Sequence, residues 1–189
     1  MARQHDLIEE LRLYHPADDA ECAHYLAIID LLTGGPKVFE RGHFTPGHVT
    51  ASCFIIDPTA SRLLLHRHRR LGRWLQMGGH CFESEIPAAA ALREGAEESG
   101  LRDLELLSKN IFDLDVHLVP AAKDEPDHHH FDLRYVARTA SPDAIVMQES
   151  ESEDLAWLPL DEAITRMNED GSTRAIRKIE QMTKKRSTM

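Results

Sequence analysis

A helix predicted from Pro87 to Ser99 constrains the fold of this chain more than any other feature of the sequence. Proline is tolerated in the first turn of a helix, the alanines that follow favour the helical state, and Gly100 is well placed to cap the C-terminal end. We expect the apolar face, which carries Ala89, Leu92 and Ala96, to pack on a β-sheet. The helix therefore indicates an α/β domain.

Three glutamates share the opposite face of this helix. At 100° per residue, Glu94, Glu97 and Glu98 fall within one face about 100° wide. Carboxylates spaced in this way repel each other by about 0.2–0.5 kcal/mol per pair, and the base nearby, Arg93, stands one residue off the face. A hard divalent cation such as Mg²⁺ removes the repulsion, because it prefers carboxylate oxygens. On the helix alone, a metal site and a solvated acidic face are equally good interpretations.

Strands are expected on both sides of this helix. Stretches rich in β-forming residues and bounded by turn residues predict strands at residues 49–56, 62–66, 73–77, 104–107, 111–119, 131–137 and 155–158. Helical spacing predicts two further helices, which begin at about Asp161 and Thr173.

The first 45 residues differ from the rest of the chain. Helical spacing predicts two helices within residues 1–33, and Asp18 or Asp19 is a suitable cap for the second. A stretch rich in Gly and Pro follows. We therefore predict an N-terminal helical extension over residues 1–45 and a second domain over residues 46–189, which includes the C-terminal helices.

The composition restricts the class of protein. Hydrophobic residues make up 42% and charged residues 29% of the 189 positions, which is typical of a globular chain with its own core. We expect no membrane partner, because no apolar run approaches the roughly 20 residues of a membrane helix. Three cysteines without a C-x-x-C pair and the lack of a signal-peptide pattern favour a cytoplasmic location. The formal net charge of −10 disfavours nucleic acid as a partner.

The helix and the loop before it contain fixed residues at a recognisable spacing. They read Gly79-x5-Glu85-x7-Arg93-Glu94-x2-Glu97-Glu98-x-Gly100-Leu101. This pattern resembles the Nudix box at each of its fixed positions. Two positions depart from the family pattern: Gly95 stands where an aliphatic residue is usual, and Met77 where Pro is frequent. The resemblance therefore implies a divergent member of the Nudix hydrolases.

This resemblance implies a fold, a cofactor and an activity. The Nudix fold is an α/β/α sandwich around a mixed β-sheet. The implied ligands of Mg²⁺ or Mn²⁺ are the carboxylates of Glu94, Glu97 and Glu98 and the carbonyl oxygen of Gly79. Glu85 and Arg93 would pair and brace the loop against the helix. Such ions neutralise a diphosphate and acidify a water, so we expect hydrolysis of a diphosphate bond in a nucleoside diphosphate linked to another moiety, or in a related nucleotide.

A carboxylate must then accept a proton from the attacking water. In Nudix hydrolases this base is a glutamate of the box or one from a later loop. The later loop here runs from Gln148 to Asp154. We therefore expect the base to be Glu94 or one of Glu149, Glu151 and Glu153.

Two predicted strands have polar faces, and an arginine-rich segment precedes the box. The polar residues are Asp113, Asp115 and His117 on one strand and His128, His130, Asp132 and Arg134 on the other. If the strands pair, their shared face is either the solvent side of the sheet or a substrate pocket in which His117, His130 and Arg134 face phosphate or sugar. A histidine metal site is less favoured, because no ligand spacing supports it. In the segment Arg67 to Arg73, Arg67 is a further candidate for a phosphate contact.

Three functions remain open at this point. The first is the hydrolase, whose partner is a small phosphorylated substrate. The second is a non-catalytic nucleotide-binding module with the same fold, and the third is an isoprenoid-diphosphate isomerase, which needs a positioned cysteine such as Cys53. The amphipathic faces of the N-terminal helices must also be covered, either by dimerisation or by packing back on the same chain.

Overall fold

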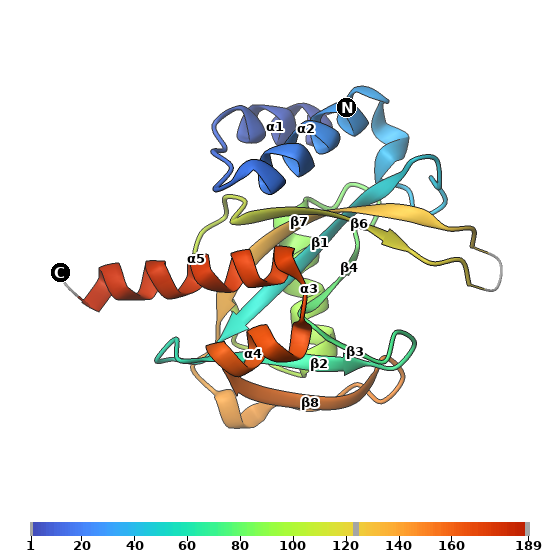
Figure 1. The fold of residues 1–189 in the computed structure, drawn as a ribbon. Coiled ribbons are helices and arrows are strands. Elements are labelled where there is room, and N and C mark those ends of the chain that lie inside the picture. Colours follow the sequence, from blue (N-terminus) through green and yellow to red (C-terminus); the bar gives the residue numbers. More distant parts are fainter. Residues whose placement is uncertain (1, 123–124, 188–189) are drawn as a thin grey trace. The chain divides into compact units, whose positions relative to one another are not determined.

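The computed structural model describes residues 2–122 and 125–187 (Figure 1). The helices are α1 (Ala2–Arg12), α2 (Asp19–Thr33), α3 (Pro87–Ser99), α4 (Leu160–Met167) and α5 (Asp170–Ser187), with short 3-10 helices η1 (Pro36–Phe39) and η2 (Pro142–Ala144). The strands are β1 (Gly47–Ile56), β2 (Arg62–His68), β3 (Arg73–Leu75), β4 (Met77–His80), β5 (Glu105–Leu106), β6 (Asp113–Val119), β7 (His128–Arg138) and β8 (Ser152–Pro159). A sheet combined with helices confirms the predicted α/β class.

Local sequence signals set the ends of the helices. Helix α3 begins at Pro87 and ends at Ser99, as predicted, and Gly100 follows with a φ of +73°, which glycine adopts without strain. Asp18 is the cap of α2, because its side chain accepts a hydrogen bond from the backbone N–H of Glu21 at 2.7 Å. Among residues 2–122 and 125–187, no helix is both long enough and apolar enough to cross a membrane.

The chain forms two compact units. Unit 1 contains the described residues of 1–52, 78–91 and 108–135, and unit 2 contains those of 53–77, 92–107 and 136–189. Strands β1, β4 and β7 and helix α3 contribute residues to both. The division into an extension over residues 1–45 and a domain over residues 46–189 stays a prediction.

In unit 1, the N-terminal helices pack back on the same chain. Helix α2 lies against β6, and α1 lies against α2. The carboxylate of Glu21 is fully buried and accepts hydrogen bonds from the backbone N–H of Leu114 at 3.2 Å and from the hydroxyl of Tyr14. Glu10 accepts a bond from the N–H of Ile111 at 2.7 Å. These contacts cover a face of both helices, and dimerisation stays a prediction.

The strands pair in the order β3-β2-β1-β7-β5, with β4 on β1, β6 on β7 and β8 on β2. Strands β6 and β7 pair in antiparallel orientation, the arrangement in which their polar faces can be shared. Their register pairs Asp113 with Arg134, Asp115 with Asp132, His117 with His130 and Val119 with His128. The polar residues predicted to share one face therefore lie side by side in unit 1.

In unit 2, β2 lies between β3 and β8 and pairs with both in antiparallel register. Leu63, Leu64 and Leu65 of β2 are fully buried, and α4 packs on these strands. Strand β1 continues this sheet, since Ile55 and Ile56 pair with β2. The apolar core of unit 2 therefore lies directly beside the second half of α3, whose Gly95 faces Ile55.

Two local predictions were wrong. The predicted strand 73–77 is two strands, because β3 pairs with β2 while β4 pairs with β1. At Gly78, a side chain would place its Cβ 2.5 Å from the Cβ of Ser52, so this glycine permits the close approach of β4 to β1. The second error concerns the packed face of α3. Ala89 is exposed, and the buried residues of the helix are Pro87, Ala88, Ala90, Ala91, Gly95, Glu98 and Ser99.

Candidate functional site

The second half of α3 presents glutamates at three different depths. The side chain of Glu97 is 53% exposed and that of Glu94 is 18% exposed, whereas residue Glu98 is 6% exposed. Glu98 is one turn from Glu94 on the same helix, next to Ser99, which is fully buried. The helix therefore presents carboxylate oxygens both at the surface and in the interior. A carboxylate as buried as Glu98 requires a compensating partner, because burying an unpaired charge is costly.

Two of these carboxylates contact the cation of Arg93. Its guanidinium donates to Glu94 at 2.8 Å and to Glu97 at 3.1 Å. Arg93 is itself 19% exposed, so both ion pairs are partly shielded from water. The arginine thus offsets part of the repulsion between the glutamates, although it stands one residue away from their face.

The N-terminal part of the box lies in unit 1. Gly79 belongs to β4, and Glu85 belongs to the loop before α3. The carboxylate of Glu85 accepts a hydrogen bond from the backbone N–H of Phe82 at 2.9 Å, which closes the box loop. Arg3 of α1 donates to the carbonyl oxygens of Phe82 and Glu85 at 2.9 and 2.7 Å. The loop is thus held at both ends, while the roles of Gly79 and Glu85 stay predictions.

The arginine-rich segment and the acidic loop contact each other in unit 2. Arg67 forms an ion pair with Glu153 at 3.6 Å. Arg69 donates through its side chain to the carbonyl oxygens of Glu149 at 2.9 Å and Ser152 at 3.2 Å, and its N–H donates to the carbonyl of Glu151 at 2.8 Å. The sequence indicated the arginine-rich segment and the acidic loop as candidates, but it did not predict that they contact each other. The side chains of Glu149, Glu151 and Glu153 remain exposed.

Arg134 is the centre of a buried polar network in unit 1. It is 2% exposed, and its guanidinium contacts Asp115 at 2.9 Å, Asp132 at 3.2 Å and Asp113 at 3.4 Å. Burial alone would lower the pKa of Arg134, but the three carboxylates outweigh it and raise the pKa, so the side chain stays charged. Burial alone would raise the pKa of Asp115, but the charge of Arg134 and the hydrogen bond with His117 outweigh it and hold this pKa well below its usual range.

This network connects the interior to His117. The Nδ1 of His117 lies 2.9 Å from the carboxylate of Asp115, which also binds Arg134. Because a carboxylate accepts, this nitrogen carries the proton and the Nε2 faces away from the network. His117 remains 44% exposed at its side chain. The ring of His130 lies 5.6 Å from that of His117, so the structure brings together the two histidines predicted for the substrate pocket.

Strand β1 supplies part of this polar face, which the sequence interpretation missed. Thr50 and Ser52 donate to the carboxylate of Asp132 at 3.1 and 2.6 Å. Both belong to an alternation of polar residues, His48, Thr50 and Ser52, in an otherwise apolar strand. The sequence therefore did contain this polar face, as an alternation with a period of two residues. It was overlooked because the residues between the polar positions are apolar.

A surface hollow of about 790 Å³ lies beside the C-terminal end of α3 in unit 2. Its lining includes Glu97, Gly100, Leu101, Asp103 and Val146. A side chain at position 100 would collide with Val146, because its Cβ would lie 2.7 Å from the Cβ of that residue. The glycine that ends the helix therefore also leaves room for the segment that borders the hollow.

Comparisons with known proteins agree with the residue pattern of the box. The family model described as NUDIX domain matches residues 46–179. The chain belongs to the Nudix family. This match includes all of the fixed residues of the box, and it confirms the family that the spacing of the box indicated. The predicted Nudix fold is confirmed as well, because solved structures of the family superimpose on the chain.

Two solved structures illustrate this likeness. The Caenorhabditis elegans Ap4A hydrolase in a binary complex is 20% identical, with a TM-score of 0.58, and the match covers 71% of this chain and 96% of that one. A hydrolase of the NUDIX family from Clostridium perfringens is 25% identical, with a TM-score of 0.54, and the match covers 71% and 97%.

A curated relative matches at the sequence level. It is the CMP-5'-(N-acetyl-N-hydroxy-3-aminopropyl)phosphonate hydrolase of Streptomyces rubellomurinus, which is 28% identical over 141 residues. The match covers 73% of this chain and 64% of the relative, so the chain spans less than two thirds of that protein's length.

Proposed function

We propose that this chain is a hydrolase that depends on a divalent cation and cleaves a diphosphate bond in a nucleoside diphosphate linked to another moiety, or in a related nucleotide. The observation that carries the proposal is the set of box glutamates on α3, which combines the deeply placed Glu98 with the accessible Glu97. Family membership supports the same reaction class, because Nudix hydrolases use divalent metals.

The donor set fits a hard cation. Glu94, Glu97 and Glu98 offer only carboxylate oxygens, which are the ligands that Mg²⁺ and Mn²⁺ prefer. Arg93 already neutralises part of their charge, so the helix holds the glutamates close to one another before a cation binds. When bound, Mg²⁺ would supply charge neutralisation of the diphosphate and a more acidic water.

The remaining work falls to side chains of the chain itself. A carboxylate must accept a proton from the attacking water, and the candidates are Glu94 and the loop residues Glu149, Glu151 and Glu153. The three loop side chains are exposed, and the ion pair with Arg67 holds Glu153 near the end of β2. Of these loop residues, Glu151 is our choice, because the hydrogen bond from Arg69 to its carbonyl fixes its backbone while its side chain stays accessible.

Substrate recognition is proposed for three side chains, and a fourth positions one of them. Arg67 and His117 are partly exposed, so each can contact a phosphate or sugar directly. Burial lowers the pKa of His130 to about 2, so this histidine is neutral and serves as a hydrogen-bonding group. Arg134 is buried among carboxylates, and we assign it a positioning role, in which it fixes Asp115 and thereby the ring of His117.

The relative from Streptomyces rubellomurinus favours one substrate class. Its name describes hydrolysis of a CMP conjugate, in which a nucleotide carries a group that is not a nucleotide. We therefore place such conjugates first among the substrates to test. The isomerase alternative is disfavoured, because burial raises the pKa of the Cys53 thiol to about 12 and the residue is fully buried.

A substrate panel with and without Mg²⁺ tests the proposal. It should contain CMP conjugates, nucleotide sugars, ADP-ribose and dinucleoside polyphosphates. We expect cleavage of at least one member only when Mg²⁺ is present, and we expect Glu94→Gln and Glu97→Gln to lower kcat by about 100-fold or more. Glu83→Gln is the matched control, since Glu83 is an exposed glutamate of the box loop outside the fixed positions. Full turnover by both variants, or no cleavage by the wild type, would refute the assignment.

A further inference from the structure

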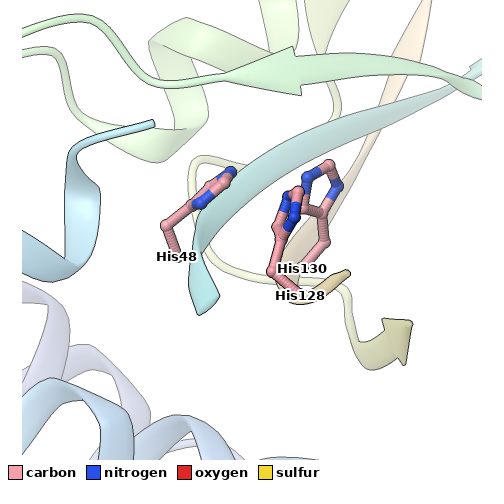
Figure 2. A group of neighbouring side chains, drawn as sticks. All are labelled: His48, His128 and His130. Carbon is pink, nitrogen blue, oxygen red and sulfur yellow. The ribbon is translucent and has the colours of Figure 1, made fainter. Parts of the chain in front are cut away.

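Unit 1 contains a second group of ligand-bearing side chains, in which His130 lies beside His48 and His128, two residues that the proposed diphosphate chemistry does not use. Among the described residues, His48, His128 and His130 form a group in which one ligand nitrogen of each lies within 4.8 Å of the others. Figure 2 shows the ring of His48, from β1, turned toward the rings of His128 and His130, from β7. Their ring centroids are 4.9 to 5.2 Å apart. Three imidazoles thus converge from two strands.

Gly47 permits the close approach of β1 to β7 that brings these histidines together. A Cβ at Gly47 would lie 1.8 Å from the carbonyl oxygen of His129, so only glycine allows β1 to start this close to β7. The backbone N–H of His129 also donates to the carbonyl of Pro46 at 3.1 Å. Because side chains alternate along a strand, His128 and His130 then face the same side as His48, while His129 points to the other.

The hydrogen bonds of two of these histidines fix their tautomers. The Nδ1 of His48 lies 3.3 Å from the carbonyl oxygen of His43, and the Nδ1 of His128 lies 2.8 Å from that of Pro126. A carbonyl oxygen can only accept, so each Nδ1 carries the proton and each Nε2 has a free lone pair. Histidines that bind metals are oriented in this way, with the other ring nitrogen donating to a carbonyl or carboxylate.

The Nε2 of His48 provides an independent indication of a ligand. His48 is fully buried, and within the described part of the chain its Nε2 has no hydrogen-bond partner. Buried polar atoms are normally satisfied, so an orphaned buried nitrogen within a group of three imidazoles requires an explanation.

We propose that His48, His128 and His130 form a binding site for a transition-metal dication of the Zn²⁺ type, separate from the carboxylates of α3. Three imidazoles suit Zn²⁺ and similar ions, whereas Mg²⁺ prefers oxygen. With bonds of about 2.0–2.1 Å, tetrahedral ligand nitrogens lie about 3.4 Å apart. The three nitrogens lie within 4.8 Å of one another, so binding requires the rings, including the stacked pair His48 and His128, to rotate toward a common point. Phe44 forms an apolar wall, since its ring lies 5.0 Å from that of His128. Three protein ligands leave a fourth position open to water or to an anionic group of a substrate.

Untagged protein tests the site, since a polyhistidine tag would bind the same ions. Wild type should take up one equivalent of Zn²⁺ in competition with a chromophoric chelator. Co²⁺ should give the intense visible bands of a tetrahedral complex. We expect His128→Ala to weaken Zn²⁺ binding by 100-fold or more, because one of three ligands is lost.

His129→Ala is the matched control, because it removes a neighbouring exposed histidine from the opposite face of β7. This variant should bind Zn²⁺ within about threefold of wild type, and Zn²⁺ should raise Tm for wild type and His129→Ala but not for His128→Ala. If His128→Ala does not fold, the Co²⁺ spectrum of wild type decides the question alone. Absence of tetrahedral bands in wild type, or equal Zn²⁺ affinity in a folded His128→Ala protein, would overturn the proposal. Glu97→Gln should retain Zn²⁺ binding, which separates this site from the hydrolytic one.

Discussion

The buried network around Arg134 should be a major determinant of stability, and Arg134→Met tests this. The substitution keeps an unbranched side chain of comparable length but removes the charge. It leaves Asp113, Asp115 and Asp132 buried without the cation that contacts each of them within 3.4 Å. Loss of one partner from a buried ion pair costs about 3–5 kcal/mol, mainly because the remaining charge is left uncompensated. We expect a loss in the free energy of unfolding of at least this size.

Urea unfolding followed by far-ultraviolet circular dichroism measures the effect. For a chain of this size, about 3–5 kcal/mol corresponds to a fall in Tm of roughly 6–20 °C. Arg138→Met is the matched control, because Arg138 is exposed at the end of the same strand and should change stability by no more than about 0.5 kcal/mol. Combining Arg134→Met with Asp113→Asn should recover part of the loss, since one uncompensated carboxylate is removed. A loss below about 1 kcal/mol in Arg134→Met would show that the network is not a stabilising feature.

Two further predictions concern unit 2. A Cβ at Gly95 would lie 3.4 Å from Leu104, 3.5 Å from Ile55 and 3.6 Å from Cys53, so Gly95→Ala should fit and stabilise α3 by up to about 1 kcal/mol. Gly95→Leu should instead cost about 1–3 kcal/mol through overpacking, and equal Tm values for the two variants would contradict this. Burial alone would raise the pKa of Asp57, but hydrogen bonds, including those from the N–H groups of Ser61 and Arg62, outweigh it and lower the pKa below the usual 3.8. The stabilisation is therefore present above about pH 4 and disappears at lower pH, so Asp57→Asn should cost about 1 kcal/mol at pH 7, and the difference from wild type in urea titrations should shrink toward pH 3.

The sequence predicted those features that depend on local spacing. The bounds of α3 followed from Pro87 and Gly100, and the polar faces of β6 and β7 followed from their alternation, although their pairing was only assumed. The family followed from the fixed positions in the box, because their spacing can be read from the sequence without knowledge of the rest of the fold.

Features that depend on tertiary packing were less accessible. The packed face of α3 was misassigned, because Gly95 and Glu98 do not look like core residues, although Leu104 and Ile55 fill the space beside Gly95. The histidine cluster combines residues 80 positions apart. No local ligand spacing reveals it, and its geometry depends on the close approach that Gly47 permits.

Manganese binding measured by electron paramagnetic resonance tests the central claim most directly, because it reports the cation at the box without a known substrate. We expect wild type to reduce the signal of free Mn²⁺ in a saturable way. Glu94→Gln and Glu98→Gln should each weaken this binding by about tenfold or more, whereas His128→Ala should not change it, because Mn²⁺ prefers oxygen ligands. Equal Mn²⁺ binding by wild type and by a protein with all three helix glutamates changed to Gln would contradict the account.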